Sequence, residues 1–343
     1  MTIEEFLEAW NNASETVLVH TSGSTGEPKP MQVEKRRMMA SARRTNDFLG
    51  LKEGDTALLC MSLDYIAGKM MVVRAIERGL RLITVEPSGH PLAVKQPQID
   101  FAAMVPMQVY NSLQVAEERE RLMQIVHLII GGGAIDDSLA AELKSFPNAV
   151  WSTYGMTETL SHIALRRLNG PEASEWYTPF PSVKVSLNEE GCLVIDALEV
   201  CAERLVTNDI AEVATQRGQA LCDPLRYSHE GQSPCVACTA FRILGRKDNV
   251  ICSGGIKIQA EEVERELHPY LRVPYLITKR QDEKFGEVVV LLTEGAVEEA
   301  QKVCERILPK YHQPRVYLHV DRIPLTETGK PARQQAAQLA TTK

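Results

Sequence analysis

The sequence lacks the features that would assign it to a membrane, nucleic-acid-binding or secreted class. No stretch of its 343 residues approaches 18 uninterrupted apolar positions, so no membrane span is expected. Basic residues number 38 against 45 acidic ones, and the net charge of −7 argues against general nucleic-acid binding. The start lacks a basic segment and predicts an amphipathic helix with Thr2 and Glu5 as a capping box. Eight cysteines without a secretion signal predict a cytoplasmic protein with mostly reduced thiols.

Two common nucleotide-binding motifs are incomplete. Gly26-Glu-Pro-Lys29 stands where a Walker A loop needs Gly-Lys followed by Ser or Thr. Gly131-Gly-Gly-Ala134 follows an apolar run, but Asp136 occupies the place of the third glycine in G-x-G-x-x-G. A nicotinamide enzyme is therefore not expected.

A different phosphate-type loop is present near the start. His20-Thr-Ser-Gly-Ser-Thr-Gly-Glu-Pro-Lys29 follows the apolar run Val17-Leu-Val19. Glycines let backbone N–H groups approach a ligand, hydroxyls donate hydrogen bonds, and a lysine adds charge, so the loop suits an oligophosphate. By composition alone, such a loop is more often an ordinary linker.

Strands and helices alternate after this loop, which predicts an α/β fold. Helices are expected at 34–49, 67–78 and 136–146, and buried strands at 56–61, 82–86, 101–105 and 125–130. A small α+β unit follows, with helices at 260–267 and 297–308 and strands at 275–278, 287–292 and 316–320. We predict domains at 1–244 and 245–343, with a polar, cysteine-containing insertion at about 212–240.

Tyr154-Gly-Met-Thr-Glu-Thr159 combines three useful side chains. A tyrosine face can stack on a purine, the Thr157 hydroxyl can reach a phosphoryl oxygen, and Glu158 can hold Mg²⁺. Alone, the block would more simply be a strand end with a packed tyrosine and a surface glutamate.

Four motifs in order resemble the acyl-adenylate-forming superfamily of acyl- and aryl-CoA ligases, luciferases and adenylation domains. These are the phosphate-type loop, the Tyr154 block, the stretch Gly245-Arg-Lys-Asp-Asn-Val-Ile-Cys-Ser-Gly-Gly255 and Pro324-Leu-Thr-Glu-Thr-Gly-Lys330. The resemblance spans roughly residues 16 to 333. It implies a large adenylate-binding domain with mixed β-sheets and helices, followed by a small mobile α+β domain. It also implies ATP, Mg²⁺, CoA and a small carboxylic acid as ligands.

The resemblance also implies individual roles. Thr157, Glu158 (the Mg²⁺ ligand) and Lys330 would be catalytic, and Asp248 would be the hinge. ATP and CoA would contact Thr21, Ser22, Gly23, Ser24, Thr25, Gly26, Lys29, Gly132, Gly133, Ala134, Tyr154, Gly155, Asp209, Arg246, Gly254 and Gly255. Asn208 replaces the glycine that the superfamily usually has before the ribose-binding aspartate, and asparagine tolerates the left-handed turn expected there.

Within the superfamily, the chain is most similar to short o-succinylbenzoate–CoA ligases of menaquinone biosynthesis. The similarity lies in the segment Leu63–Arg74 and in the early position of the phosphate-type loop, before which most members carry a longer segment. A compact enzyme and one that needs a partner chain both remain open. Tyr65, Lys69 and Arg74 would contact the acid. Arg74 lies in an apolar helical run, where it would face either solvent or a cleft, because an unpaired buried arginine is costly. The resemblance favours the cleft, where Arg74 would bind the aromatic carboxylate of o-succinylbenzoate.

The sequence leaves several questions open. The predicted insertion contains Cys222, His229, Cys235 and Cys238, which would suit a structural zinc site or be unligated thiols. The acid could be another aryl or acyl compound, and the acceptor could be a carrier protein. The chain could also bind adenylates without catalysis. Oligomeric state is undetermined, with a homo-oligomer as one option.

Overall fold

The computed structural model describes residues 1–20, 30–95, 97–133, 135, 137–215, 239–326 and 331–342. They divide into two compact units. Unit 1 comprises Met1–Ser186, Val194–Leu205 and Val213–Arg242, and unit 2 comprises Leu187–Leu193, Val206–Glu212 and Ile243–Lys343. The predicted domain boundary at residue 245 stays a prediction.

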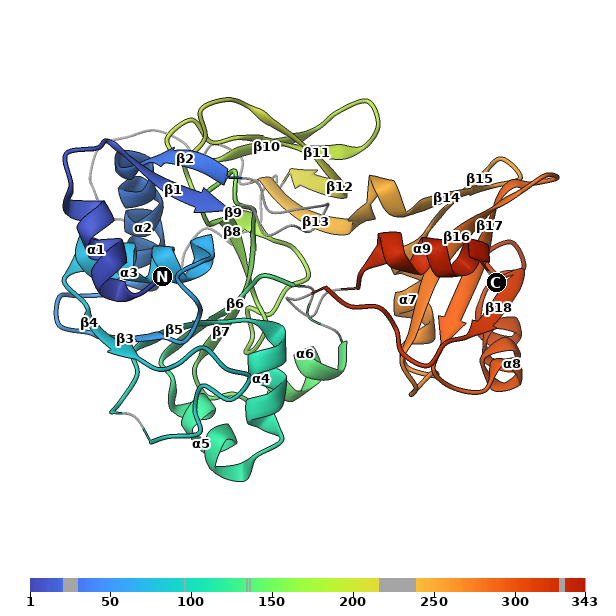
Figure 1. Cartoon of the computed structure of the whole chain (residues 1–343), viewed down its shortest axis with the longest axis horizontal. Coiled ribbons are helices and arrows are strands. Elements are labelled where there is room, and N and C mark those ends of the chain that lie inside the picture. The colour runs from blue at the N-terminus through green and yellow to red at the C-terminus, as the bar shows by residue number, and fades with distance from the viewer. Residues whose placement is uncertain are drawn as a thin grey trace. The chain divides into compact units, whose positions relative to one another are not determined.

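Unit 1 is built around a seven-stranded sheet (Figure 1). In spatial order its strands are β4 (Arg81–Thr84), β3 (Thr56–Leu59), β5 (Phe101–Met104), β6 (His127–Ile130), β7 (Ala149–Gly155), β8 (His162–Arg167) and β9 (Thr178–Pro179). The first five are parallel, and the β7–β8 and β8–β9 pairs are antiparallel. Because parallel strands end at one edge, the segments after β5, β6 and β7 begin side by side.

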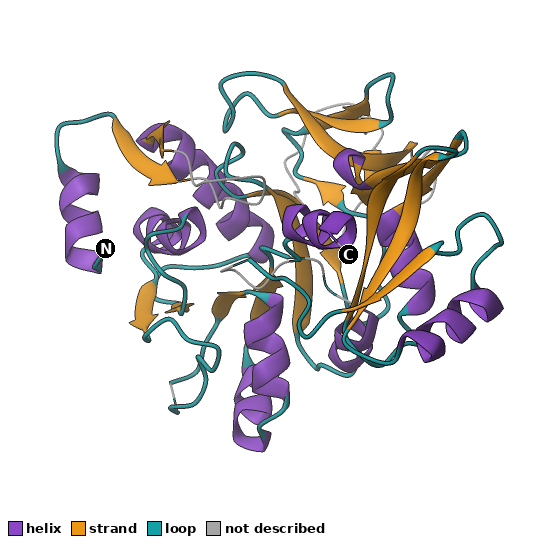
Figure 2. Ribbon diagram, turned by 45° about the vertical axis from the view of Figure 1, so that its right-hand side comes forward, coloured by secondary structure: helices purple, strands orange, loops and turns teal. Residues whose placement is uncertain are grey.

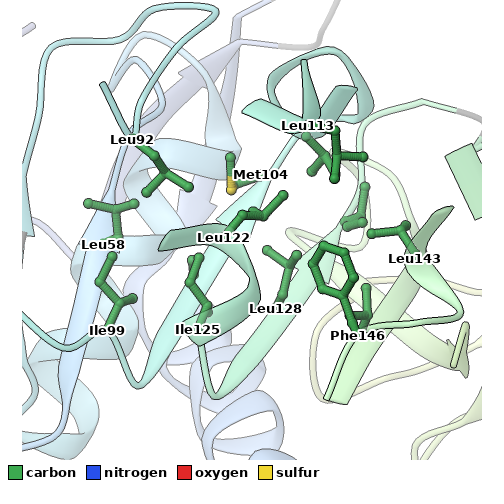
Figure 3. Packing of buried hydrophobic residues seen from close by; sticks show 14 of the residues in the cluster. Leu58, Leu92, Ile99, Met104, Leu113, Leu122, Ile125, Leu128, Leu143 and Phe146 are labelled. Atoms are coloured by element: carbon green, nitrogen blue, oxygen red, sulfur yellow. The ribbon is translucent and has the colours of Figure 1, made fainter. Parts of the chain in front are cut away.

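Helices cover both faces of this sheet. One face packs on α4 (Pro106–Leu113), α5 (Ala116–Gln124) and α6 (Asp137–Leu143), and α2 (Lys35–Leu49) and α3 (Ile66–Arg78) lie on the other side in Figure 1. Alternate strand residues such as Leu58, Met104 and Leu128 meet Leu113 and Leu122 from the helices (Figure 3). The central strands β3, β5 and β6 are almost entirely buried, which explains why they are mostly apolar. The expectation of a buried strand at 82–86 is wrong, because β4 is the edge strand and its residues are half-buried or exposed.

The chain starts with α1 (Ile3–Asn11), followed by the hairpin β1 (Thr16–His20) and β2 (Pro30–Glu34). Thr2 and Glu5 form the predicted capping box. The ends of α2 and α3 also agree with prediction, because Gly50 and Gly79 follow them with left-handed φ angles of 66° and 71°.

A four-stranded sheet has the order β10 (Lys184–Leu187), β11 (Cys192–Asp196), β12 (Leu205–Thr215), β13 (Thr239–Arg246). β12 continues to Thr215 and β13 begins at Thr239, so a few residues at each end of the approximate range 212–240 belong to strands, and the insertion itself stays a prediction. The β-branched residues Ile210 and Val213 favour extended backbone near the end of β12. The turn expected at Asn208 is wrong, because this residue lies within β12 and has no positive φ.

Unit 2 contains a five-stranded sheet (Figure 2). Its strands are β15 (Ile256–Gln259), β14 (Val250–Ser253), β17 (Gly286–Thr293) and β16 (Tyr275–Asp282), with β18 (Val316–His319) parallel to β17 and the 3₁₀ turn η1 (Lys247–Asn249) before β14. One face packs on α7 (Ala260–Leu267) and α8 (Val297–Ile307), and the other on α9 (Arg333–Thr342). The predicted α/β fold class, with mixed sheets and helices, is confirmed. Among the described residues, no helix is long and apolar enough to cross a membrane.

Candidate adenylate and acid site

Two predicted site segments meet at the carboxyl edge of the large sheet. β6 ends at Ile130 and pairs in parallel with β7, so the turn Gly131–Gly133 lies beside the end of β7. A Cβ on Gly131 would lie 2.2 Å from Thr153 Oγ1, and Gly132 has a φ of +80°. A Cβ on Gly155 would lie 2.3 Å from the Ser161 carbonyl oxygen. Glycine is therefore required at Gly131 and Gly155 by close packing and at Gly132 by its backbone conformation.

The loop that follows β7 is tightly constrained. The buried Thr159 hydroxyl accepts a hydrogen bond from Met156 N at 2.9 Å and can donate to the Ser161 carbonyl oxygen at 2.7 Å. Leu160 has a φ of 66°, a strained value for a non-glycine residue. Thr157, which this loop carries, is buried, while Glu158 is exposed. The loop therefore presents these two side chains from a fixed backbone.

Tyr154 belongs to an aromatic cluster that sequence reasoning missed. Its ring centroid lies 5.1 Å from that of Phe241 and 5.8 Å from that of Tyr177, and the Tyr177 hydroxyl lies 2.8 Å from Ser152 Oγ. Tyr177 and Phe241 come from distant parts of the chain, so no local pattern could predict the contact. The cluster restricts the orientation of the Tyr154 ring, and its contact with a purine stays a prediction.

Arg74 is the most unusual charged residue in unit 1. It is only 2% exposed, and its Nη2 donates to Ser161 Oγ at 2.5 Å. Nη1 reaches only the sulfur of Met71 at 3.7 Å, and Nε has no hydrogen-bond partner among the described residues. No described carboxylate lies within ion-pair distance of Arg74. Burial lowers the pKa of this guanidinium to about 10, so it is still charged at neutral pH.

Ser161 and His162, also missed from the sequence, join Arg74 to the loop after β7. His162 is buried, with Nδ1 3.3 Å from Ser161 Oγ and Nε2 3.1 Å from Thr45 Oγ1 on α2. Burial, together with the charge of Arg74, lowers the pKa of His162 well below its usual 6.5, so the imidazole is neutral. Their only sequence signal is their position directly after the Tyr154 block.

Lys69 and Tyr65, the other two residues predicted to contact the acid, differ in burial. Lys69 is buried and donates from Nζ to the Leu18 carbonyl oxygen at 3.2 Å, and burial lowers its pKa against the opposing charge of Asp64. Tyr65 is 36% exposed and lies at the start of α3. Arg74 and Lys69 are thus two buried cations on one helix.

Three predicted residues come together within unit 2. Arg246 Nη1 lies 3.8 Å from Asp209 Oδ1, and its Nη2 lies 3.5 Å from Asp248 Oδ2. Asn208 Nδ2 also donates to Asp248 Oδ2 at 3.3 Å. Two carboxylates and a guanidinium here could bind vicinal hydroxyl groups such as those of a ribose.

Gly254 and Gly255 form the two-residue turn of the β14–β15 hairpin. Their φ angles are +57° and +84°, as a type I′ turn requires. The turn accounts for both glycines without a ligand, so their predicted contact with CoA stays a prediction.

Several predicted residues lie outside the described residues. They are Thr21, Ser22, Gly23, Ser24, Thr25, Gly26, Lys29, Ala134, Lys330 and the four predicted zinc ligands Cys222, His229, Cys235 and Cys238. Within the described part of the chain, no group of three or more His, Cys, Asp or Glu residues could hold a metal. Glu158 is compatible with Mg²⁺ as a single protein ligand, because Mg²⁺ commonly takes one carboxylate together with water and phosphate oxygens.

Comparison with known proteins identifies the family of the chain. A sequence model described as AMP-binding enzyme matches residues 6–199, which is more than half of the chain. The chain belongs to the AMP-binding enzyme family. The 2-succinylbenzoate–CoA ligase of Bacillus cytotoxicus is 25% identical over 97% of this chain and 72% of its own length.

Solved structures extend the comparison. The acyl-CoA synthetase (AMP-forming)/AMP-acid ligase II-like protein from Dyadobacter fermentans is 31% identical, covers 98% of this chain and 93% of its own, and has a TM-score of 0.62. The o-succinylbenzoate coenzyme A synthetase (MenE) of Bacillus subtilis, in complex with ATP and magnesium ion, is 21% identical over 93% of this chain and 69% of its own, with a TM-score of 0.71. The Bacillus subtilis structure shows that the two proteins share a fold. Family and relatives together indicate an acid–CoA ligase.

Proposed function

We propose that this enzyme ligates an aromatic dicarboxylic acid of the o-succinylbenzoate type to CoA through an acyl-adenylate. One carboxylate oxygen attacks the α-phosphorus of ATP, the bond to pyrophosphate breaks, and an acyl-adenylate forms. The CoA thiol then loses its proton and attacks the acyl carbon, and AMP leaves.

Arg74 is the observation that carries the choice of a diacid. A buried guanidinium without a carboxylate is costly in the free protein, and a bound carboxylate would offset that cost. Ser161 connects Arg74 to the loop that carries Thr157 and Glu158. A substrate with two carboxylates could therefore bind Arg74 through one and react through the other. The names of the Bacillus relatives support o-succinylbenzoate as this diacid.

The remaining roles follow the predicted site. Thr157 would contact the α-phosphate and Glu158 would hold Mg²⁺, which supplies positive charge to the phosphate oxygens. Lys330 would add charge during adenylation, and movement about Asp248 would separate the two half-reactions. Asp209 and Arg246 would bind the ribose.

The test is pyrophosphate release across a panel of acids, with and without CoA. We expect release with o-succinylbenzoate and formation of its CoA thioester. Release without transfer to CoA would favour a carrier-protein acceptor. If no acid gives pyrophosphate while AMP still binds, the protein is a non-catalytic adenylate binder and the proposal is wrong.

A further inference from the structure

Arg74 is the first member of a hydrogen-bond chain that runs from α3 to α2. The chain passes through Ser161 and the two nitrogens of His162 to the Thr45 hydroxyl, which lies 3.3 Å from the Ser41 carbonyl oxygen. All of these side chains are buried or half-buried in unit 1. Each link can therefore be assigned a donor and an acceptor.

The far end fixes the direction of the whole chain. The Ser41 carbonyl can only accept, so the single Thr45 proton is donated to it, and Thr45 Oγ1 must accept from His162 Nε2–H. A neutral imidazole protonated on Nε2 has an acceptor at Nδ1, which takes the Ser161 proton. Ser161 Oγ then offers lone pairs to Arg74 Nη2. One tautomer satisfies every link.

We propose that His162 is a positioning residue for acid recognition: its Nδ1 acceptor orients the Ser161 hydroxyl, and Ser161 in turn fixes the Arg74 guanidinium. This inference rests on the proposed function of Arg74. It assigns a role to a buried histidine that touches no reacting atom.

The surroundings of His162 keep that acceptor available. The charge of Arg74 on α3 lowers the pKa of His162, and Thr45 on α2 contacts the imidazole at Nε2. The centroid of the Phe180 ring lies 5.6 Å from that of His162. Burial and the nearby cation both disfavour an imidazolium, which would carry a proton on Nδ1 and could not accept from Ser161.

Three substitutions of His162 separate its two nitrogens. Asparagine carries its amide at the level of Nδ1, so His162→Asn keeps an acceptor for Ser161. Glutamine reaches the level of Nε2, so His162→Gln keeps only the contact with Thr45. His162→Leu removes both. His127→Leu is the matched control, since His127 lies at the opposite end of the parallel strands, and burial also lowers its pKa.

The substrates are o-succinylbenzoate and 4-oxo-4-phenylbutanoate, which lacks the ring carboxylate. For the diacid, we expect His162→Leu and His162→Gln to raise KM about tenfold, as the loss of one oriented hydrogen bond at a charged group would do, with kcat nearly unchanged. His162→Asn should restore KM to within about threefold of the parent. KM for the monoacid should be equal in all variants.

Thr45→Val provides an independent test if the His162 variants fold poorly. It leaves His162 in place but removes the acceptor that keeps the proton on Nε2. KM for the diacid should therefore rise, while KM for the monoacid should not. The positioning role would be overturned if KM changed equally for both acids. It would also be overturned if KM for the diacid were no lower in His162→Asn than in His162→Gln. If the parent protein itself uses the monoacid as well as the diacid, the proposed function of Arg74 is wrong and this inference falls with it.

Discussion

Replacing Arg74 with leucine tests the acid site most directly. Arg74 has one short hydrogen bond, to Ser161, and no described carboxylate partner. The substitution removes the charge but keeps an apolar side chain among Met71, Phe101 and the rest of the α3 packing. The substitution should weaken binding of the acid, but it should not lower the stability of the free protein.

The loss of binding can be estimated from the burial of the pair. Removing one partner of a buried, hydrogen-bonded ion pair typically costs about 3–5 kcal/mol, because the other charge is left desolvated. At about 1.4 kcal/mol per factor of ten, the lower figure corresponds to a KM increase of roughly a hundredfold for o-succinylbenzoate. KM for ATP should change by less than about twofold, since no charge at the nucleotide is altered.

The free protein should not lose stability. Burial lowers the pKa of Arg74, which means that the folded state disfavours its charge. Leucine removes that penalty, and buried ionic groups replaced by apolar ones often leave stability unchanged or raise it by about 1–4 kcal/mol. The melting temperature without substrate should therefore stay equal or rise.

The assay combines initial rates of pyrophosphate release with thermal unfolding. Arg78→Gln is the control, because Arg78 ends the same helix and already pairs with the carboxylates of Asp47 and Glu77. It should leave KM for the acid unchanged. An Arg74→Leu protein that uses the diacid as well as its parent would refute both the pocket and the diacid. A large fall in melting temperature would show that Arg74 has a structural role instead.

Four further predictions concern other parts of the chain. Lys330→Ala should slow adenylation by at least about a hundredfold, as loss of a transition-state charge contact would do, yet leave thioester formation from supplied acyl-adenylate nearly intact; equal slowing of both steps would contradict the two-step role. Asp248→Pro should show the reverse, with adenylate formed and transfer stalled. Arg333→Met should lower the free energy of unfolding by about 3 kcal/mol in a denaturant titration, because it leaves Glu264 without its two-pronged partner at 2.7 and 3.1 Å. Stability should then fall further as pH rises above about 4.5, since burial already raises the pKa of Glu264. Elemental analysis of chelator-washed protein tests the zinc site, which is refuted if zinc is absent.

Much of the fold could be predicted because local chemistry and tertiary structure agree. Gly50 and Gly79 end their helices with left-handed backbone, and the apolar runs at 101–105 and 125–130 became the buried strands β5 and β6. The run at 82–86 became the edge strand β4, which is only partly buried because it has a neighbour on one side alone. The helices α4 and α5 were not predicted. Both are short, and α5 is rich in charged residues, so neither shows a strong apolar period.

The candidate site was predictable only in part. Motif order makes Tyr154, Thr157 and Glu158 candidates, but the contact of Tyr154 with Phe241 joins residues 87 positions apart in the sequence. Ser161 reaches Arg74 in the same way, across an equal separation of 87 residues. The first contact brings β13 to β7, and the second brings α3 to the loop between β7 and β8. No single segment of the sequence encodes either contact.

Helix α3 nevertheless shows how charged residues in a buried helix can point to a binding site. Its sequence is apolar enough to be buried, yet it contains Lys69 and Arg74, whose desolvation opposes folding. Lys69 recovers one hydrogen bond from a backbone carbonyl and Arg74 one from a serine, but neither forms an ion pair with a described carboxylate. A helix with two desolvated, unpaired cations is less stable than an apolar helix would be. We expect this free-energy cost to be offset when a ligand is bound. An anionic substrate is the simplest source of that free energy, and it would bind most tightly where the free enzyme is least well satisfied.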